Sequence, residues 1–234
     1  MTLVFLVRHA HSTANEENIL SGRISGVHLS EKGRVQARAL STRLSDLPLK
    51  VLRTSPLDRC IESISPWFKR TIQTDSNSKL VLKIDEDLLE ADYGTWSGRK
   101  LRALSKDPLW KDIQKRPSRV TFPRGESISA MQSRGIRAVE NSLKVRGKGN
   151  ILLVSHGDVI KSILAHALAM NLDDFQRIVI DPASVSVLDF SNSTPRVLLL
   201  NDTRSKLSSG ALFGRSKLAL VGGGSGTSAK ERAK

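Results

Sequence analysis

The chain has 234 residues, of which 39% are hydrophobic and 26% charged, a composition that is typical of a globular domain and excludes a disordered or fibrous protein. Its formal net charge is +14. Aromatic residues make up only 4%, too few for a base-stacking surface, so we interpret the charge as a basic surface suited to an anionic substrate and expect no specific nucleic-acid partner.

Three features of the sequence bear on location. No segment is apolar over the length that a membrane span requires, and we expect no membrane partner. The short apolar N-terminus leads directly to Arg8 without the pattern of a secretory signal. Cys60 is the single cysteine, which fits a reducing compartment. We therefore expect a cytoplasmic protein; no pattern points to a particular oligomeric state.

Short runs rich in valine, isoleucine and leucine predict six β-strands. In chain order these are Leu3–Val7, Lys50–Arg53, Leu80–Ile84, Asn150–Ser155, Val185–Phe190 and Val197–Leu200. Because helical patterns alternate with them, we predict an α/β fold: a three-layer α/β/α sandwich with a mainly parallel central sheet. In such folds ligands bind beyond the carboxyl ends of the strands.

Four of the intervening segments have the apolar spacing of amphipathic helices. The predicted helices begin at Ser30, Ser55, Glu126 and Gly157. In the second helix we assign Ser55 as the N-cap and Pro56 as the first helical residue. The third helix continues to Leu143 and contains Gly135, which we expect to weaken it.

Composition also divides the chain. We predict one catalytic domain over residues 1–203, in which residues 97–125, with several prolines, form an insertion near the site. Residues 204–234 are basic and rich in glycine and serine, so we expect a flexible tail there.

Polar residues follow three of the predicted strands. The first strand is followed by Arg8 and His9, the second by Arg59, and the fourth by His156 and Gly157. Because the carboxyl ends of parallel strands share one edge of a sheet, we expect these residues to converge beside a helix N-terminus. Guanidinium groups match phosphate oxygens, and free backbone N–H groups add to the positive field. The sequence therefore predicts a phosphate-binding site.

A histidine in such a site can also react. Neutral imidazole is a nucleophile that can form a phosphohistidine, provided that an acid protonates the leaving oxygen. Glu90 follows a strand candidate and has aromatic neighbours, and burial there would raise its pKa as this role requires. His9 and His11 could instead form half a metal site, but further ligands are lacking, so we expect no metal and no cofactor.

Six segments in order resemble the histidine phosphatase superfamily, which has the phosphoglycerate mutase-like fold: "LVRHAHSTAN", "HLSEKGRVQA", "SPLDRC", "LLEADYGTWSG", "FPRGES" and "VSHGDVI". The resemblance covers residues 2 to about 202 and is strongest to an actinobacterial subgroup described as phosphomutases. It implies that His9 is the phosphoryl-accepting nucleophile and Glu90 the proton donor. It also implies that Arg8, Arg59 and His156 complete the phosphate pocket.

The same resemblance implies a set of residues that bind substrate or orient the nucleophile. These are Ser12, Asn15, Gly22, Arg23 and Gly157. Two residues depart from the family pattern: Ala10 replaces a glycine, and His11 replaces an acidic residue usual in the mutases, which places His11 at the rim of the pocket. The paired arginines that grip the substrate carboxylate in the glycolytic mutases are not recognisable in residues 99–125, and "GTWSG" is more similar to the phosphatases.

We therefore expect a metal-independent phosphatase of the histidine acid phosphatase type, which hydrolyses the phosphate monoester of a small molecule through a phosphohistidine on His9, with Glu90 as general acid. A phosphoglycerate mutase-like phosphomutase stays open as an alternative. A protein that binds a phosphorylated ligand or nucleic acid without catalysis is a further alternative, although binding alone would not need Glu90 as an acid.

Overall fold

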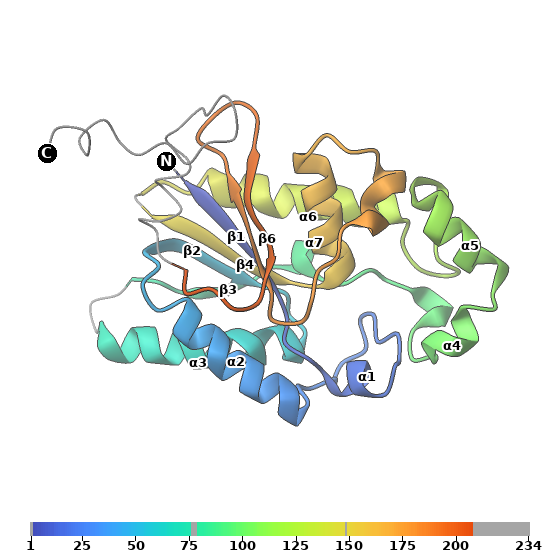
Figure 1. Ribbon diagram of the computed structural model, residues 1–234, viewed down its shortest axis with the longest axis horizontal. Helices are drawn as coiled ribbons and strands as arrows, with labels where there is room; N and C mark the ends of the chain where they lie inside the picture. Colours follow the sequence, from blue (N-terminus) through green and yellow to red (C-terminus); the bar gives the residue numbers. More distant parts are fainter. Residues whose placement is uncertain (1, 76–78, 148, 208–234) are drawn as a thin grey trace, which may run out of the picture.

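The computed structural model describes residues 2–75, 79–147 and 149–207, in which six strands form one sheet in the spatial order β3-β2-β4-β1-β5-β6 (Figure 1). The strands are β1 (Leu3–Arg8), β2 (Leu49–Thr54), β3 (Leu82–Ile84), β4 (Asn150–Ser155), β5 (Val185–Asp189) and β6 (Arg196–Asp202). Strands β3, β2, β4 and β1 are mutually parallel, whereas β5 is antiparallel to both of its neighbours. This confirms the predicted mainly parallel sheet.

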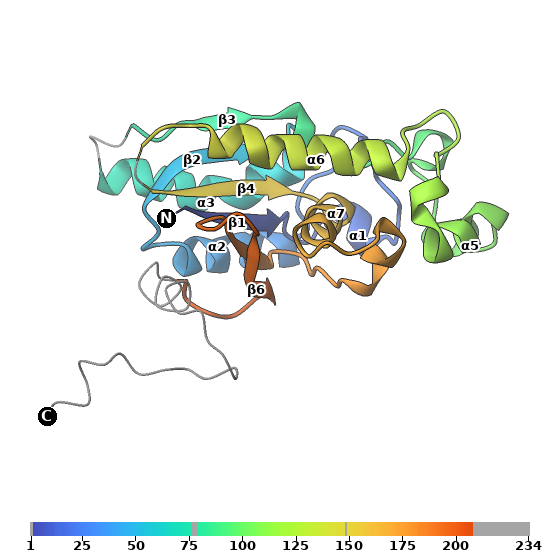
Figure 2. The ribbon, with the colours of Figure 1, turned by 90° about the horizontal axis from the view of Figure 1, so that it is seen from above.

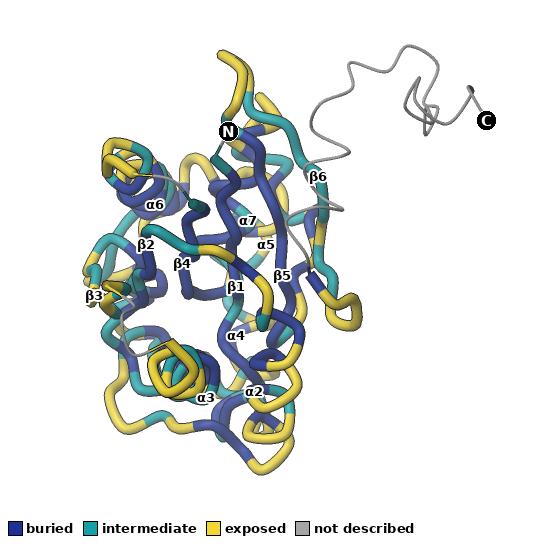
Figure 3. The backbone as a smooth tube through the Cα atoms, turned by 90° about the vertical axis from the view of Figure 1, so that its left-hand side faces the viewer, coloured by how far each residue is buried: buried dark blue, intermediate teal, exposed yellow. Residues whose placement is uncertain are grey.

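Helices cover both faces of the sheet and complete the three layers (Figure 3). The helices are α1 (Thr13–Glu16), α2 (Glu31–Arg43), α3 (Asp58–Thr74), α4 (Leu101–Leu104), α5 (Pro108–Lys115), α6 (Ile128–Leu143) and α7 (Gly157–Ala167). Alternate residues of β1 enter different cores, because successive side chains of a strand point to opposite faces. Phe5 packs in the core that includes residues of α2 and α3, and Leu6 packs in the core that includes residues of α6 and α7.

The parallel register places the ends of the central strands at one level. Phe5 of β1 and Leu52 of β2 both pair with Leu152 of β4. The ladder continues past the strands, since His9 N–H donates to the Ser155 carbonyl at 3.0 Å. The chain segments that leave β1, β2 and β4 therefore begin beside one another at the carboxyl edge of the sheet.

The predicted start of the second helix is wrong. Helix α3 begins at Asp58, and its N-cap is Leu57, which makes no side-chain capping bond. Ser55 instead continues the β2 ladder, because its N–H donates to the Val154 carbonyl at 2.9 Å and its hydroxyl lies 2.8 Å from Nε2 of His156. Ser55 therefore does not cap the helix, because α3 begins three residues later and the Ser55 hydroxyl is bonded to His156. In contrast, Ser30 caps α2 as predicted, accepting from Gly33 N–H at 3.2 Å.

Helix α6 agrees with the helix predicted from about Glu126 to Leu143. Ser127 is its N-cap and accepts the Ala130 N–H, so Glu126 lies outside the helix. Gly135 lies inside α6 as predicted, and a Cβ there would come within 3.2 Å of Val159 and Ile163 of α7. The glycine thus allows close packing of the two helices, which offsets its low helix propensity.

Residues 97–125 contain α4 and α5, which project beyond the carboxyl ends of the strands (Figures 1 and 2).

At the predicted C-terminal boundary of the domain, packing continues past residue 203, because Leu207 is buried in a core and its N–H donates to the Arg43 carbonyl at 2.9 Å. The rest of the predicted tail, residues 208–234, lies outside the described residues. Within the described ranges, no helix combines the length and apolar character needed to cross a membrane.

Candidate active site

A cavity of about 480 Å³ opens at the carboxyl edge of the sheet. Its walls include seven residues that the sequence predicted for the site: Arg8, His9, Asn15, Gly22, Arg59, Glu90 and Gly157. Three other predicted residues, Ser12, Arg23 and His156, are absent from the described cavity wall and lie behind it. The tertiary structure thus brings together residues that follow four of the strands.

His9 is held in a neutral form with one free ring nitrogen. Its side chain is buried, and Nδ1 lies 2.7 Å from the Ala10 carbonyl oxygen. A carbonyl only accepts, so Nδ1 carries the hydrogen and Nε2 keeps its lone pair. Burial, followed by the charges of Arg59 and Arg8, holds the pKa of His9 well below its usual value. The imidazole is therefore in the state that a nucleophile requires.

Two arginines, the buried Arg59 and the partly buried Arg8, flank His9 with buried N–H groups. Arg59 is 1% exposed and donates through Nη2 to the Gly22 carbonyl at 2.7 Å, while its Nε and Nη1 have no hydrogen-bond partner among the described residues. Arg8 donates through Nη1 to the Ile180 carbonyl at 2.5 Å, and its Nε is likewise without a partner there. Buried charged donors without acceptors are costly, and the oxygens of an anion would satisfy them. The geometry is that of an anion site beside His9.

His156 supports Arg59 from behind the cavity wall. It is the N-cap residue of α7 and is fully buried, with its ring centroid 5.2 Å from that of His9. Nδ1 lies 3.3 Å from Nη2 of Arg59, which can only donate, so the hydrogen is on Nε2 and is donated to Ser55 Oγ. Burial, followed by Arg59 and His9, lowers the pKa of His156 well below its usual value. Neutral His156 thus orients the guanidinium without adding charge.

Glu90 is a buried carboxyl at the edge of the cavity. Its Oε1 accepts the Ala91 N–H at 2.9 Å, and its side chain has Asp158 as a charged neighbour. Burial, followed by the charge of Asp158, raises the pKa of Glu90 to about 7. Asp158 stays ionised because Lys161 and the Tyr93 hydroxyl, at 3.2 and 2.8 Å, outweigh the effect of its burial on its pKa. The pair therefore holds one proton near neutral pH, and that proton resides on Glu90.

The loop after β1 shapes the wall through its backbone. Ser12 and Asn15 form a reciprocal capping box at α1, with Asn15 N–H donating to Ser12 Oγ at 3.2 Å and Ser12 N–H to Asn15 Oδ1 at 3.0 Å. Asn15 faces the cavity, whereas Ser12 does not. Gly22 has φ +51°, and a Cβ there would lie 2.9 Å from both Ser97 Oγ and the Tyr93 ring. Only glycine fits that position without strain while its carbonyl accepts from Arg59.

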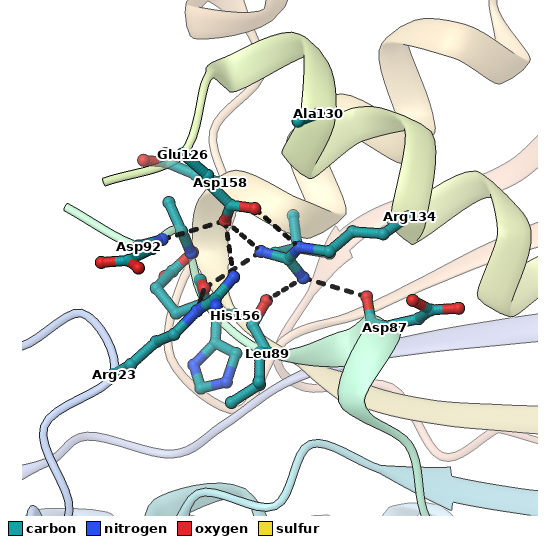
Figure 4. A network of polar contacts seen from close by, with 12 residues as sticks. Arg23, Asp87, Leu89, Asp92, Glu126, Ala130, Arg134, His156 and Asp158 are labelled. Carbon is teal, nitrogen blue, oxygen red and sulfur yellow. Dashed lines mark hydrogen bonds and ion pairs between the residues drawn. The ribbon is translucent and has the colours of Figure 1, made fainter. Parts of the chain in front are cut away.

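Arg23, expected to bind substrate, is absent from the described cavity wall and has partners within the protein. Its Nε donates to the Glu90 carbonyl at 2.9 Å, and its Nη2 pairs with Glu126 at 2.9 Å (Figure 4). Oε1 of Glu126 also accepts from Nη2 of Arg134 at 2.6 Å, so one carboxylate holds both guanidinium groups. A carboxylate 103 residues away in the sequence therefore holds the Arg23 guanidinium.

Arg134 completes this network from α6. Its Nη2 donates to the Glu90 carbonyl at 3.0 Å, and its Nη1 donates to the carbonyls of Asp87 and Leu89 (Figure 4). The sequence analysis did not identify Arg134, because only the tertiary structure brings it to this loop. The network fixes the backbone that carries the candidate acid.

The two histidines of the N-terminal motif face different cavities. His11 lines a second cavity together with Lys32, Gln36 and Arg43, and its Nδ1 lies 2.8 Å from Ser30 Oγ. His11, expected at the rim of the substrate pocket, thus lines a neighbouring cavity, which shares Asp181 with the first. The part of the chain that the structure describes contains no group of three or more His, Cys, Asp or Glu side chains placed to hold a metal ion.

Some residues of the site were missed by sequence reasoning. Ser55 was assigned to a helix cap, and Asp158 was not assigned a role although it directly follows His156 and Gly157 in "VSHGDVI". Apolar residues of the insertion and of residues 178–180 form further parts of the wall. No local pattern separates these residues from ordinary core positions.

Comparison with known proteins agrees with this arrangement. Residues 4–203 match the family model of the histidine phosphatase superfamily (branch 1). The chain is 28% identical over 207 residues to phosphoserine phosphatase 1 of Hydrogenobacter thermophilus, covering 87% of this chain and 93% of that protein. It is also 28% identical over 196 residues to a probable phosphoglycerate mutase of Erwinia tasmaniensis, covering 82% of this chain and 87% of the relative.

Solved structures show the same fold. A mycobacterial glucosyl-3-phosphoglycerate phosphatase superposes with a TM-score of 0.76 at 21% identity, covering 86% of this chain and 99% of that one. The matched relatives include both phosphatases and phosphoglycerate mutases. With nearly all of its described residues matching the family model, the chain belongs to the histidine phosphatase superfamily.

Proposed function

We propose that this protein is a phosphatase that hydrolyses a phosphate monoester through a phosphohistidine on Nε2 of His9. The observation that carries the proposal is a neutral histidine with a free lone pair beside the unpartnered buried N–H groups of Arg8 and Arg59. Two guanidinium groups next to the nucleophile supply the positive charge that a phosphoryl transfer needs, so we expect activity without an added metal.

In the first step, the ester phosphate binds to Arg8 and Arg59, and Nε2 of His9 attacks phosphorus in line with the leaving oxygen. The P–N bond forms as the ester P–O bond breaks, and protonated Glu90 gives its proton to the departing alcohol. In the second step, Glu90 as carboxylate takes a proton from water, whose oxygen attacks phosphorus. The P–N bond breaks, and inorganic phosphate leaves with His9 neutral again.

A phosphomutase is the second candidate, because a relative named as a probable phosphoglycerate mutase aligns with most of the chain. A mutase returns the phosphoryl group to its product and must keep water away from the phosphohistidine. Assays of 3-phosphoglycerate with and without 2,3-bisphosphoglycerate separate the two reactions: we expect release of inorganic phosphate without isomerisation. Isomerisation that depends on the bisphosphate would favour the mutase.

The test of the proposal compares His9→Ala with His11→Ala. We expect His9→Ala to lose turnover of p-nitrophenyl phosphate and all phosphoenzyme labelling from a 32P-labelled ester. His11 is two residues away but lines the second cavity, so His11→Ala should keep both. The label should be stable in alkali and lost in acid, as a phosphoramidate requires. Turnover by folded His9→Ala at the native rate, or a label on another residue, would overturn the proposal.

A further inference from the structure

The cavity extends from the phosphate end to a wall made by the insertion. Helix α4 contributes Leu101, and α5 contributes Trp110 and Ile113. Both helices lie beyond the carboxyl edge of the sheet, where the leaving group of a bound ester would project (Figures 1 and 2). We infer that the alcohol half of the substrate is an apolar, flat group without a carboxylate, held against Trp110. This inference rests on the proposed phosphatase function.

Trp110 is a partly exposed aromatic side chain with a rigid support. Its ring is 6.3 Å from that of Trp96, with only 20° between the two planes. Trp96 is 2% exposed and is packed in turn against the ring of Phe122, at 5.9 Å. The buried rings therefore hold Trp110 in place at the cavity wall, and binding a flat group requires little further ordering of the side chain.

A second stretch of the cavity wall is also apolar. Ile178, Val179 and Ile180 line it, and Val179 is 63% exposed. An apolar side chain that is exposed at the mouth of a cavity gains free energy when an apolar ligand covers it. The apolar residues of α5 and of residues 178–180 accordingly favour an apolar leaving group over a hydrated one.

The charges of the cavity disfavour a carboxylate on the substrate. Among the described residues, the cationic side chains of the wall are Arg8 and Arg59, at the phosphate end, and Lys161. Nζ of Lys161 already contacts Asp158 at 3.2 Å and Gln176 Oε1 at 3.0 Å. Asp158 and Asp181 also line the cavity, so a substrate carboxylate would meet like charges there instead of a free cation.

Two substrates with the same reacting centre test this inference. In 3-phenylpropyl phosphate and 3-(phosphonooxy)propanoate the phosphate is on a primary alcohol, so the leaving groups are chemically similar and only the far end differs. We expect kcat/KM to be at least about tenfold higher for the phenylpropyl ester, the size of effect that aromatic stacking and burial produce.

Variants of α5 locate the effect. Trp110→Ala should lower kcat/KM for the phenylpropyl ester about tenfold and leave the value for the carboxylated ester within about twofold, whereas Trp110→Phe should restore most of the preference. Lys111→Ala, at the exposed neighbouring position, is the control that should change neither value. Loss of activity on both esters to the same extent in folded Trp110→Ala would mean that Trp110 has no role in specificity.

The outcomes separate the two proposals. If the native protein forms no phosphohistidine with either ester, the proposed function is wrong. If it forms the phosphohistidine but hydrolyses the carboxylated ester as efficiently as the phenylpropyl ester, only the inference about the leaving group is wrong.

Discussion

The charge of Asp158 should set the pH range in which the protein works. Asp158→Asn keeps the size of the side chain and an oxygen that can accept from Tyr93, but it removes the negative charge that is the second-largest cause of the raised pKa of Glu90. Burial, the largest cause, is unchanged. The pKa of Glu90 in the variant should therefore fall from about 7 but stay above its usual value of 4.5.

The size of the shift follows from ordinary electrostatics. A neighbouring carboxylate contributes on the order of one pKa unit, or about 1.4 kcal/mol, where some screening remains. Because Glu90 must be protonated to assist the leaving group, kcat/KM decreases as pH rises through its pKa. A shift of about one unit would lower kcat/KM roughly ninefold at about pH 8 and leave it nearly unchanged at about pH 5.

The assay is the pH dependence of kcat/KM for one ester, with Asp174→Asn as the control. Asp174 is on the surface near residues that line the cavity, so its variant should keep the native profile. A uniform loss of activity at all pH values in folded Asp158→Asn, or a shift of the alkaline limb to higher pH, would refute the assignment of Glu90 as the acid controlled by Asp158.

Three other variants test the network and the loop around the site. Glu90→Gln should be inactive but, above about pH 7, more stable than the native protein by roughly 3 kcal/mol. Folding raises the pKa of Glu90 from 4.5 to about 7, so the native protein loses stability as pH rises between those values, and the variant does not. Urea unfolding of both proteins at about pH 5 and pH 8 measures this, and an equal gain in stability at both pH values would contradict it. Arg23→Met should lower kcat on the order of tenfold and change competitive inhibition by inorganic phosphate little, because Arg23 contacts the Glu90 carbonyl and is absent from the cavity wall. Weaker inhibition by phosphate would instead support a contact between Arg23 and the substrate. Gly22→Ala should lower the free energy of unfolding by about 1–3 kcal/mol, since the positive φ and the close approach to Ser97 both oppose a Cβ, and an unchanged thermal midpoint would refute this.

Much of the fold could be predicted because a strand has a pattern that is visible in its own short segment of sequence. The alternation of Leu3, Phe5 and Val7 with Val4 and Leu6 needs only a two-residue period, and both sets are buried because helices cover both faces. Once the sheet is parallel, residues that follow the strands must meet at one edge. Sequence reasoning could therefore bring together the segments that carry His9, Arg59 and His156 without knowing any contact.

Errors occurred where a side chain had two possible partners. Ser55 has the sequence context of a helix cap, but its hydroxyl bonds His156, which is 101 residues further along the chain. Arg23 has the context of a substrate-binding loop, but its guanidinium bonds the Glu90 carbonyl and Glu126. The bond between Ser55 and His156 is buried and those of Arg23 are partly buried, and such bonds outweigh a local preference that water could replace.

Local pattern alone thus accounts for the six strands, because periodicity involves only near neighbours in the sequence. The alternation of strands with helices accounts for the mainly parallel pairing, and the parallel pairing in turn accounts for the convergence of a histidine with two arginines. Tertiary packing decided the remaining properties of the site. It set which nitrogen of His9 is free, it raised the pKa of Glu90 through burial and Asp158, it placed His11 in a separate cavity, and it put Trp110 on the cavity wall. Those properties depend on atoms that are far apart in the sequence and become neighbours only when the chain folds.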